Sequence, residues 1–250
     1  MPTYRDRGIV LRANPVRDAD RRYTIFTEAH GKITILAKGS RKSKSKMSAH
    51  LASFGVVDLM VARGRLTDHL AGADLKLPAR TIIGSLPKMS LLQSMLLAAD
   101  AFTRRDQPEP RLFKLLGDFI ITLDTQPEPH LNERSQAFAS FTLKLTDILG
   151  FALELDRCVR CRQTLQPIGN ALNVIRGGIE CRRCRDGLAP AVSSETIKAL
   201  RYLRGAEPRQ AWRLTMPSPI QRELKFVTEL VIATNLEGKL PALRYFQAVG

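Results

Sequence analysis

The chain has 250 residues, of which 44% are hydrophobic and 25% charged, a composition that excludes disorder along the whole length. Lysine and arginine number 39 against 24 aspartates and glutamates, which gives a net charge of +15. Such an excess attracts polyanions, so nucleic acid is the first expected partner and an anionic membrane surface the second; charge kept for solubility is the alternative. The chain lacks an apolar run of about eighteen residues and the apolar core of a secretory signal, so we expect a cytoplasmic protein without a membrane span.

The positive charge is uneven along the chain. Residues 1–80 carry a net charge of +9, whereas residues 81–156 carry −3. Residues 157–190 and 191–250 carry +5 and +4. Because the basic character flanks a slightly acidic middle, the sequence predicts two separate parts with different roles.

Short β-prone runs fill the chain before residue 80. They alternate with polar or glycine-containing turns, which is typical of strands. Five such runs in about eighty residues predict a small closed barrel, with the OB-fold as the natural candidate and an SH3-like barrel or a small sandwich as alternatives. We therefore expect an OB-fold DNA-binding domain over residues 1–80. The runs are residues 7–13, 23–29, 32–39, 54–64 and 66–76.

Beyond residue 80 apolar residues recur at intervals of three and four, which is the spacing of helices. Three such patterns lie between Pro87 and Gly150, and two more lie at about 197–205 and 220–238. The sequence thus predicts an α+β protein whose second part, residues 81–250, is mainly helical. This part also contains a cysteine module at about residues 157–188.

Two C-x-x-C pairs, Cys158/Cys161 and Cys181/Cys184, are separated by nineteen residues. This spacing is typical of two knuckles that close on one tetrahedral zinc ion, and four thiolates leave no open coordination position. The pairs therefore predict one structural Zn²⁺ site in a reducing compartment; thiols without metal, a disulfide or a redox pair are the alternatives. The arginines beside the cysteines either form a solvated surface or contact phosphate. They are Arg157, Arg160, Arg162, Arg182, Arg183 and Arg185.

A basic run spaced by glycine and serine follows the third predicted strand. Its cations contribute little to a core and favour contact with the phosphate backbone, although a nuclear-localisation signal has a similar composition. Aromatic residues make up 6% of the chain, so backbone contacts are expected to outweigh base stacking. The predicted DNA-binding residues are Lys38, Arg41, Lys42, Lys44 and Lys46, extended by Arg21, Arg22, Arg63 and Arg65.

The sequence contains no phosphate-binding loop, and its four histidines stand in no metalloprotease motif, so no enzyme is predicted. One alternative is a metal-dependent nuclease or nucleotidyltransferase that uses Asp18, Asp20 and Asp58. A second alternative is an RNA-binding or ribosome-associated zinc protein, because small barrels and zinc modules occur there too.

Four motifs in the first third of the chain resemble the start of RecO proteins, which are bacterial recombination mediators. The helical middle, the cysteine module and the last helix also match that family's layout. One departure is that Arg162 and Arg185 follow the cysteine pairs, where a glycine often stands. The motifs are the acidic pair in residues 17–20, the strand turn TIFTEAHG at 24–31, the basic AKGSR at 37–41 and the corner ARGR at 62–65.

The resemblance implies an N-terminal OB-fold joined to a helical domain with a zinc module. It also implies binding to single- and double-stranded DNA, strand annealing, and action with RecR to load RecA onto strands covered by single-strand-binding protein. A protein of this kind is expected in the bacterial cytoplasm, associated with the nucleoid. Because many members of the family lack a full cysteine set, zinc is not essential to the role that the resemblance implies.

Overall fold

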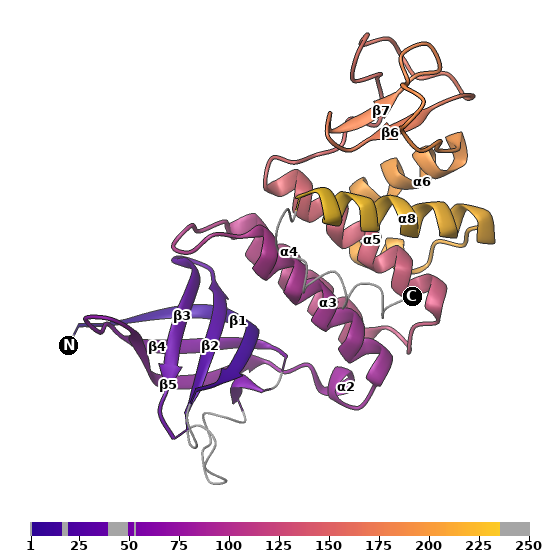
Figure 1. The fold of residues 1–250 in the computed structure, drawn as a ribbon. Helices are drawn as coiled ribbons and strands as arrows, with labels where there is room; N and C mark the ends of the chain where they lie inside the picture. The colour runs from indigo at the N-terminus through magenta and orange to yellow at the C-terminus, as the bar shows by residue number, and fades with distance from the viewer. Residues whose placement is uncertain (1, 17–19, 40–49, 53, 236–250) are drawn as a thin grey trace. The chain divides into compact units, whose positions relative to one another are not determined.

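The computed structural model describes residues 2–16, 20–39, 50–52 and 54–235. The chain divides into two compact units, Met1–Glu128 and Pro129–Gly250 (Figure 1). The sequence predicts a change from strands to helices near residue 80, and the fifth strand does end at Leu77. The compact division falls later because the next three helices belong to the same unit as the strands.

The first unit begins with five strands that form a closed barrel in the order β1-β2-β3-β5-β4. All neighbouring strands are antiparallel except β3 and β5, which run parallel. Strand β1 is long because it pairs with both β4 and β2, with a change of register between Val10 and Arg12. The strands are β1 (Thr3–Pro15), β2 (Arg21–Thr27), β3 (Gly31–Ala37), β4 (Val56–Ala62) and β5 (Asp68–Leu77).

The barrel interior is filled by alternate residues of its strands, as the two-residue period of a strand requires. On β4, Val57, Leu59 and Val61 are buried and their neighbours are partly exposed. Tyr23 and Ile25 contribute from β2 to the same cluster. The barrel core is therefore formed by residues of the β-prone runs that predicted the strands.

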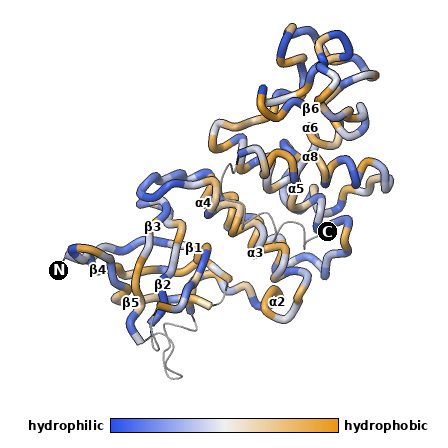
Figure 2. The backbone as a smooth tube through the Cα atoms, viewed as in Figure 1, coloured by the Kyte–Doolittle hydropathy of each residue, from blue (hydrophilic) through white to orange (hydrophobic). Residues whose placement is uncertain are grey.

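Three helices complete the first unit: α2 (Arg80–Ile83), α3 (Leu86–Phe102) and α4 (Pro110–Thr125). The hydroxyl of Ser85 accepts the amide of Lys88 and caps α3, whose first turn contains a proline. Helix α3 packs against β1, so the barrel and the helices share one compact unit. Figure 2 shows the apolar residues that run along α3 and α4.

The second unit is built around α5 (Leu131–Ile148), which packs against α6 (Ser194–Gly205), α7 (Pro208–Trp212) and α8 (Ser218–Asn235). Between the cysteine pairs, Gly169-Asn170 and Gly177-Gly178 predict the bends of a β-hairpin. Two short antiparallel strands, β6 (Ala171–Asn173) and β7 (Gly178–Glu180), confirm the hairpin. Leu172 and Ile179 of this hairpin belong to the same buried cluster as Leu200 and Leu224 of the helices. The cysteine module therefore packs against the helices through a shared hydrophobic core.

The helices of the described residues are short or contain several charges. Among them, none is long and apolar enough to cross a lipid bilayer.

Candidate metal centre and nucleic-acid interface

The two cysteine pairs converge as their spacing predicts. The Sγ atoms of Cys158, Cys161, Cys181 and Cys184 all lie within 4.8 Å of one another. The sulfurs of Cys161 and Cys181 are 3.8 Å apart. A tetrahedral metal ion bound about 2.3 Å from each sulfur, the distance typical of zinc, requires sulfurs about 3.8 Å apart. The four cysteines therefore have the donor type and the spacing to hold one metal ion.

Backbone turns hold each pair in place. The amide of Arg162 donates to the carbonyl of Cys158 at 2.9 Å, and the amide of Arg185 donates to the carbonyl of Cys181 at 3.0 Å. Arg162 has a φ of +62°, a left-handed conformation that glycine adopts at lower cost. The guanidinium of Arg160 donates to the carbonyl of Cys184 at 2.6 Å and so joins the two turns.

The protonation of the thiols also suits a cation between them. Burial raises the pKa of the Cys158 thiol, but backbone amides such as those of Cys161 and Cys181 outweigh burial and lower that pKa to about 6. The hydrogen bond with the Cys161 side chain raises the pKa of Cys184 to about 12. Sulfurs this close cannot all be ionised unless a cation neutralises them, and metal binding provides that charge.

The arginines around the cysteines differ in their partners, although all are exposed. Arg162 lies 3.9 Å from Glu154. Asp156 is held by Arg201 and Arg204 of α6 at 2.9 and 3.3 Å. Nearby carboxylates are thus largely engaged. Among the ion pairs of the described residues, Arg162 is the arginine beside the cysteines that pairs with a carboxylate, and Arg160 bonds to a carbonyl instead. No carboxylate pairs there with the other four, Arg157, Arg182, Arg183 and Arg185.

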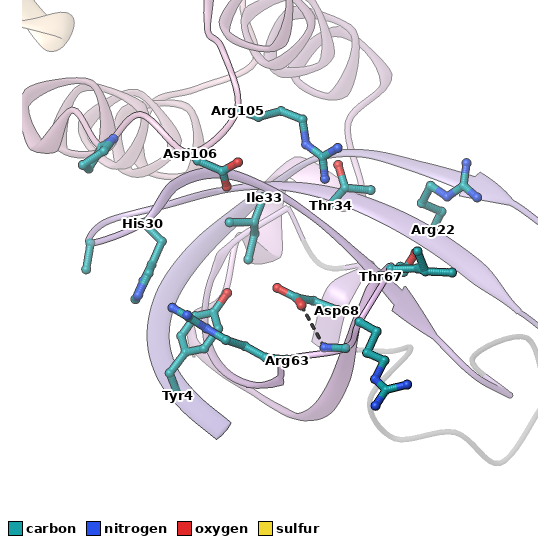
Figure 3. Close-up of a pocket in the computed structure, with 15 residues that line it drawn as sticks. Tyr4, Arg22, His30, Ile33, Thr34, Arg63, Thr67, Asp68, Arg105 and Asp106 are labelled. Carbon is teal, nitrogen blue, oxygen red and sulfur yellow. Dashed lines mark hydrogen bonds between the residues drawn. The ribbon is translucent and has the colours of Figure 1, made fainter. Parts of the chain in front are cut away.

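A second candidate site lies on the barrel, in the first unit. A cavity of about 730 Å³ opens where the turn between β4 and β5 meets the start of β1 and the loop after α3 (Figure 3). Arg22, Arg63, Arg65 and Arg105 line it, against the carboxylates of Asp68 and Asp106. The excess of arginine makes this cavity suited to a polyanion.

The loop that carries Arg105 is attached to the barrel by hydrogen bonds. The amide of Asp106 donates to the carbonyl of Lys32 at 3.1 Å. The ammonium of Lys32 in turn donates to the carbonyl of Thr103 at 2.6 Å. Gly31 has a φ of +69°, and a Cβ there would lie 2.2 Å from the carbonyl oxygen of Gln107. The glycine of the TIFTEAHG motif is therefore required for this loop to approach the barrel.

The predicted DNA-binding residues fall into three groups. Arg22, Arg63 and Arg65 are brought together at the cavity, whereas Arg21 begins β2 opposite Ala37 and does not line it. Lys38 is exposed directly after β3. The other predicted cations lie outside the described residues. They are Arg41, Lys42, Lys44 and Lys46.

The aspartates of the nuclease alternative have separate surroundings. A carboxylate oxygen of Asp20 accepts the amide of Gly39 at 2.8 Å. Asp58 lies 3.5 Å from the ammonium of Lys76. Asp18 lies outside the described residues. Among the residues with described positions, the group of His, Cys, Asp and Glu side chains with metal-binding spacing is the four-cysteine cluster.

Comparisons with known proteins agree with this layout. The α+β fold, with its arginine-lined barrel, its helical unit and its four-cysteine cluster, defines a basic two-part protein with a candidate metal site. The family model "Recombination protein O N terminal" matches residues 1–76, and "Recombination protein O C terminal" matches residues 84–244. The chain belongs to the RecO family of DNA repair proteins, as the N-terminal motifs predict.

Relatives named "DNA repair protein RecO" match over most of their length. The protein of Frankia casuarinae is 32% identical over 99% of both chains. That of Dehalococcoides mccartyi is 28% identical over 98% of this chain and 96% of its own. That of Rubrobacter xylanophilus is 33% identical over 81% of both.

Proposed function

We propose that this protein is a DNA-binding recombination mediator in DNA repair that catalyses no reaction. The observation that carries the proposal is the cavity of the barrel, where four arginines from distant segments meet two carboxylates. Arginine is the side chain best suited to phosphate, because its planar guanidinium donates two parallel hydrogen bonds. Membership of the RecO family supports the same role.

The barrel is an OB-fold in this proposal. Its closed five-stranded order and the parallel pairing of β3 with β5 support that assignment. OB-folds bind single strands in a positively charged groove, and here the turn between β4 and β5 supplies Arg63 and Arg65. Binding through phosphates also extends to double-stranded DNA, because both forms carry the same backbone.

The basic surface supports strand annealing. Two complementary strands repel each other, and cations that neutralise their phosphates reduce this repulsion. In the full role, the protein acts with RecR to load RecA onto DNA covered by single-strand-binding protein. The site of action is the cytoplasm, at the nucleoid.

The four-cysteine cluster holds one structural Zn²⁺ in this proposal. A tetrahedral set of four thiolates suits zinc, and the closed set leaves no position for a substrate. Because Leu172 and Ile179 between the pairs belong to the helical core, the ion stabilises the second unit.

Charge reversal at the cavity tests DNA binding. In a double variant Arg22→Glu with Arg65→Glu, two residues that line the cavity, we expect at least a tenfold loss of affinity for single-stranded DNA at about 0.1 M salt. The slope of log affinity against log salt should become shallower by about 1.4, since each phosphate contributes about 0.7. Strand annealing should slow in parallel. Fluorescence anisotropy and an annealing assay measure these effects.

The matched control reverses two arginines in the second unit. Arg209 and Arg213 are exposed residues of the second unit, so Arg209→Glu with Arg213→Glu gives the same net charge. This pair should leave the salt slope unchanged. Equal losses of affinity in both double variants would show that DNA binds through a general attraction between opposite charges and not at the cavity. Stronger competition by RNA than by DNA would favour an RNA-binding protein.

The basic run after β3 provides a second test. Reversal of its five cations to glutamate should abolish binding, and a wild-type slope near about −3.5 corresponds to about five phosphates. Labelled strands incubated with magnesium should remain uncut; cleavage that is lost with Asp20→Asn would establish a nuclease instead. The five positions are Lys38, Arg41, Lys42, Lys44 and Lys46.

A further inference from the structure

The barrel cavity contains planar side chains as well as charge. The rings of Tyr4 and His30 lie with their centroids 4.3 Å apart, tilted by 38°. The guanidinium carbon of Arg63 lies 5.3 Å from the centroid of the Tyr4 ring. Figure 3 shows these three side chains gathered beside Asp68 at the turn between β4 and β5. Flat groups at stacking distances form a surface on which another flat group fits.

The neighbouring backbone and carboxylates hold this surface in place. The carboxylate of Asp6, which is 3% exposed, lies 2.6 Å from Nδ1 of His30 and accepts the amides of Ala29 and His30. Asp68 accepts the amide of Gly64 at 3.1 Å, which fixes the turn next to Arg63. The planar group is therefore ordered before any ligand arrives, and this lowers the entropic cost of binding.

The rest of the cavity combines charge with an apolar tip. Arg22, Arg65 and Arg105 line it, and Leu66 at the tip of the turn is 99% exposed. The volume of about 730 Å³ lies within the range of about 300–1,000 Å³ that small-molecule sites occupy. A nucleotide has the matching parts, namely a flat base and a charged phosphate.

We propose that this cavity is a nucleotide subsite in which one base of a single strand stacks on the planar group of Arg63, Tyr4 and His30. The flanking phosphates contact Arg22, Arg65 or Arg105. This inference rests on the proposed DNA binding and adds a base-dependent contribution to it. It also revises the expectation, drawn from the low aromatic content, that stacking has little part in binding.

The test separates the base from the phosphate. We compare an oligothymidine of about fifteen nucleotides with an abasic strand of the same length and charge. For the wild-type protein the abasic strand should bind at least about fivefold more weakly, because stacking on a protein contributes about 1–3 kcal/mol per base. The salt slope should be the same for both strands, since the number of phosphates is unchanged.

Two variants locate the effect. Arg63→Lys keeps the charge and loses the plane, so it should weaken binding of oligothymidine several-fold and leave the abasic strand unaffected. Tyr4→Leu retains apolar packing against the barrel core and should also reduce the preference for bases. Arg209→Lys, in an exposed position of the second unit, is the matched control and should change nothing.

The possible outcomes are distinct. Equal affinity of the wild type for the two strands overturns the subsite and leaves phosphate-based DNA binding intact. Equal losses for both strands in Arg63→Lys also overturn it, because the residue then acts through its hydrogen bonds to phosphate. Absence of binding to either strand overturns the proposed function and the subsite together. Urea unfolding verifies that Tyr4→Leu is folded.

Discussion

The side-chain ammonium of Lys32 donates to the backbone carbonyl of Asp100 at 2.6 Å and thereby joins β3 to the end of α3. Lys32 is buried, and its ammonium also lies 3.1 Å from the Asp100 carboxylate. A charge removed from water in this way is tolerated because several acceptors surround it. The barrel and the helices of the first unit are thus linked by a polar contact as well as by packing.

Replacement of Lys32 by alanine should therefore lower the free energy of unfolding by about 2–4 kcal/mol, because a nearly buried carboxylate and two carbonyls lose their shared donor. Urea unfolding measures the change. Lys114, an exposed residue that pairs with Asp118 four positions along α4, is the control, and Lys114→Ala should cost a few tenths of a kcal/mol. Comparable losses of unfolding free energy in both variants would mean that the buried contacts of Lys32 do not stabilise the fold.

Gly31 provides a second prediction in the same region. Its positive φ and the close carbonyl of Gln107 leave no room for a Cβ. We expect Gly31→Ala to destabilise the protein by about 2 kcal/mol or more and to displace the loop of Arg105. Gly117 on α4 has no atom within 4 Å of an added Cβ, so Gly117→Ala should be neutral or stabilising. Urea unfolding distinguishes the two.

Much of the fold could be predicted from local patterns. The β-prone runs on either side of the tight connection at Arg63–Arg65 predict two strands, and β4 and β5 confirm them. Helices α3, α4, α5, α6 and α8 carry long apolar patterns, whereas α2 and α7 have four and five residues. A helix that short completes hardly more than one turn, so it leaves no periodic signal.

The two candidate sites differ in how far the sequence reveals them. The metal centre could be predicted because two C-x-x-C pairs are sufficient to define the ligands. The planar group at the cavity could not, because Tyr4, His30 and Arg63 are brought together by the pairing of β1 with β4 and by the carboxylate of Asp6. Arg105 is placed at the cavity because the backbone amide of its neighbour Asp106 donates to the carbonyl of Lys32.

The contact between α6 and α8 should make the stability of the fold depend on pH. Glu223 on α8 accepts both the amide and the hydroxyl of Ser193 at the start of α6, at 2.9 and 2.7 Å. Burial raises the pKa of Glu223, but these hydrogen bonds outweigh it and hold the pKa below 4.5. A carboxyl group whose pKa is lower in the folded state than in the unfolded state stabilises the fold at any pH above its unfolded-state pKa. This contribution is lost as the pH falls through the folded-state pKa.

The variant Glu223→Gln should therefore be less stable than the wild type at pH 7, by up to about 1 kcal/mol after solvent screening. The difference should shrink as the pH falls below about 4.5 and the wild-type carboxyl group takes up its proton. Urea unfolding at a series of pH values gives both curves. Parallel curves would show that Glu223 contributes through its shape and not through its charge.

Metal binding should release a number of protons that depends on pH. The Cys184 thiol, with a pKa of about 12, loses a proton on binding at any ordinary pH. The Cys158 thiol, with a pKa of about 6, is already ionised at pH 7.5 and loses a proton on binding below about pH 6. Proton release per Zn²⁺ should thus rise by about one as the pH falls through 6. Calorimetry in buffers of different ionisation enthalpy measures the number of protons released. A number that stays the same at every pH would contradict the lowered pKa of Cys158.

The residues that follow the two cysteine pairs are both arginine, yet their backbones differ. Arg162 has a φ of +62°, whereas Arg185 is not among the described residues with a positive φ. A side chain in the left-handed region costs about 1 kcal/mol relative to glycine, so Arg162→Gly should stabilise the metal-loaded protein by about that amount. Its ion pair with Glu154 spans 3.9 Å and its side chain is 71% exposed, so its loss costs little.

Arg185→Gly is the matched control for this prediction. It removes the same charge beside the other cysteine pair but relieves no strain, so it should leave stability unchanged or lower it by about 0.5–1 kcal/mol. Both variants should retain one metal ion per chain, because neither residue supplies a ligand. Urea unfolding and metal analysis of each protein test the pair. Equal shifts in stability would show that charge beside the thiolates, and not backbone conformation, sets the effect of these arginines.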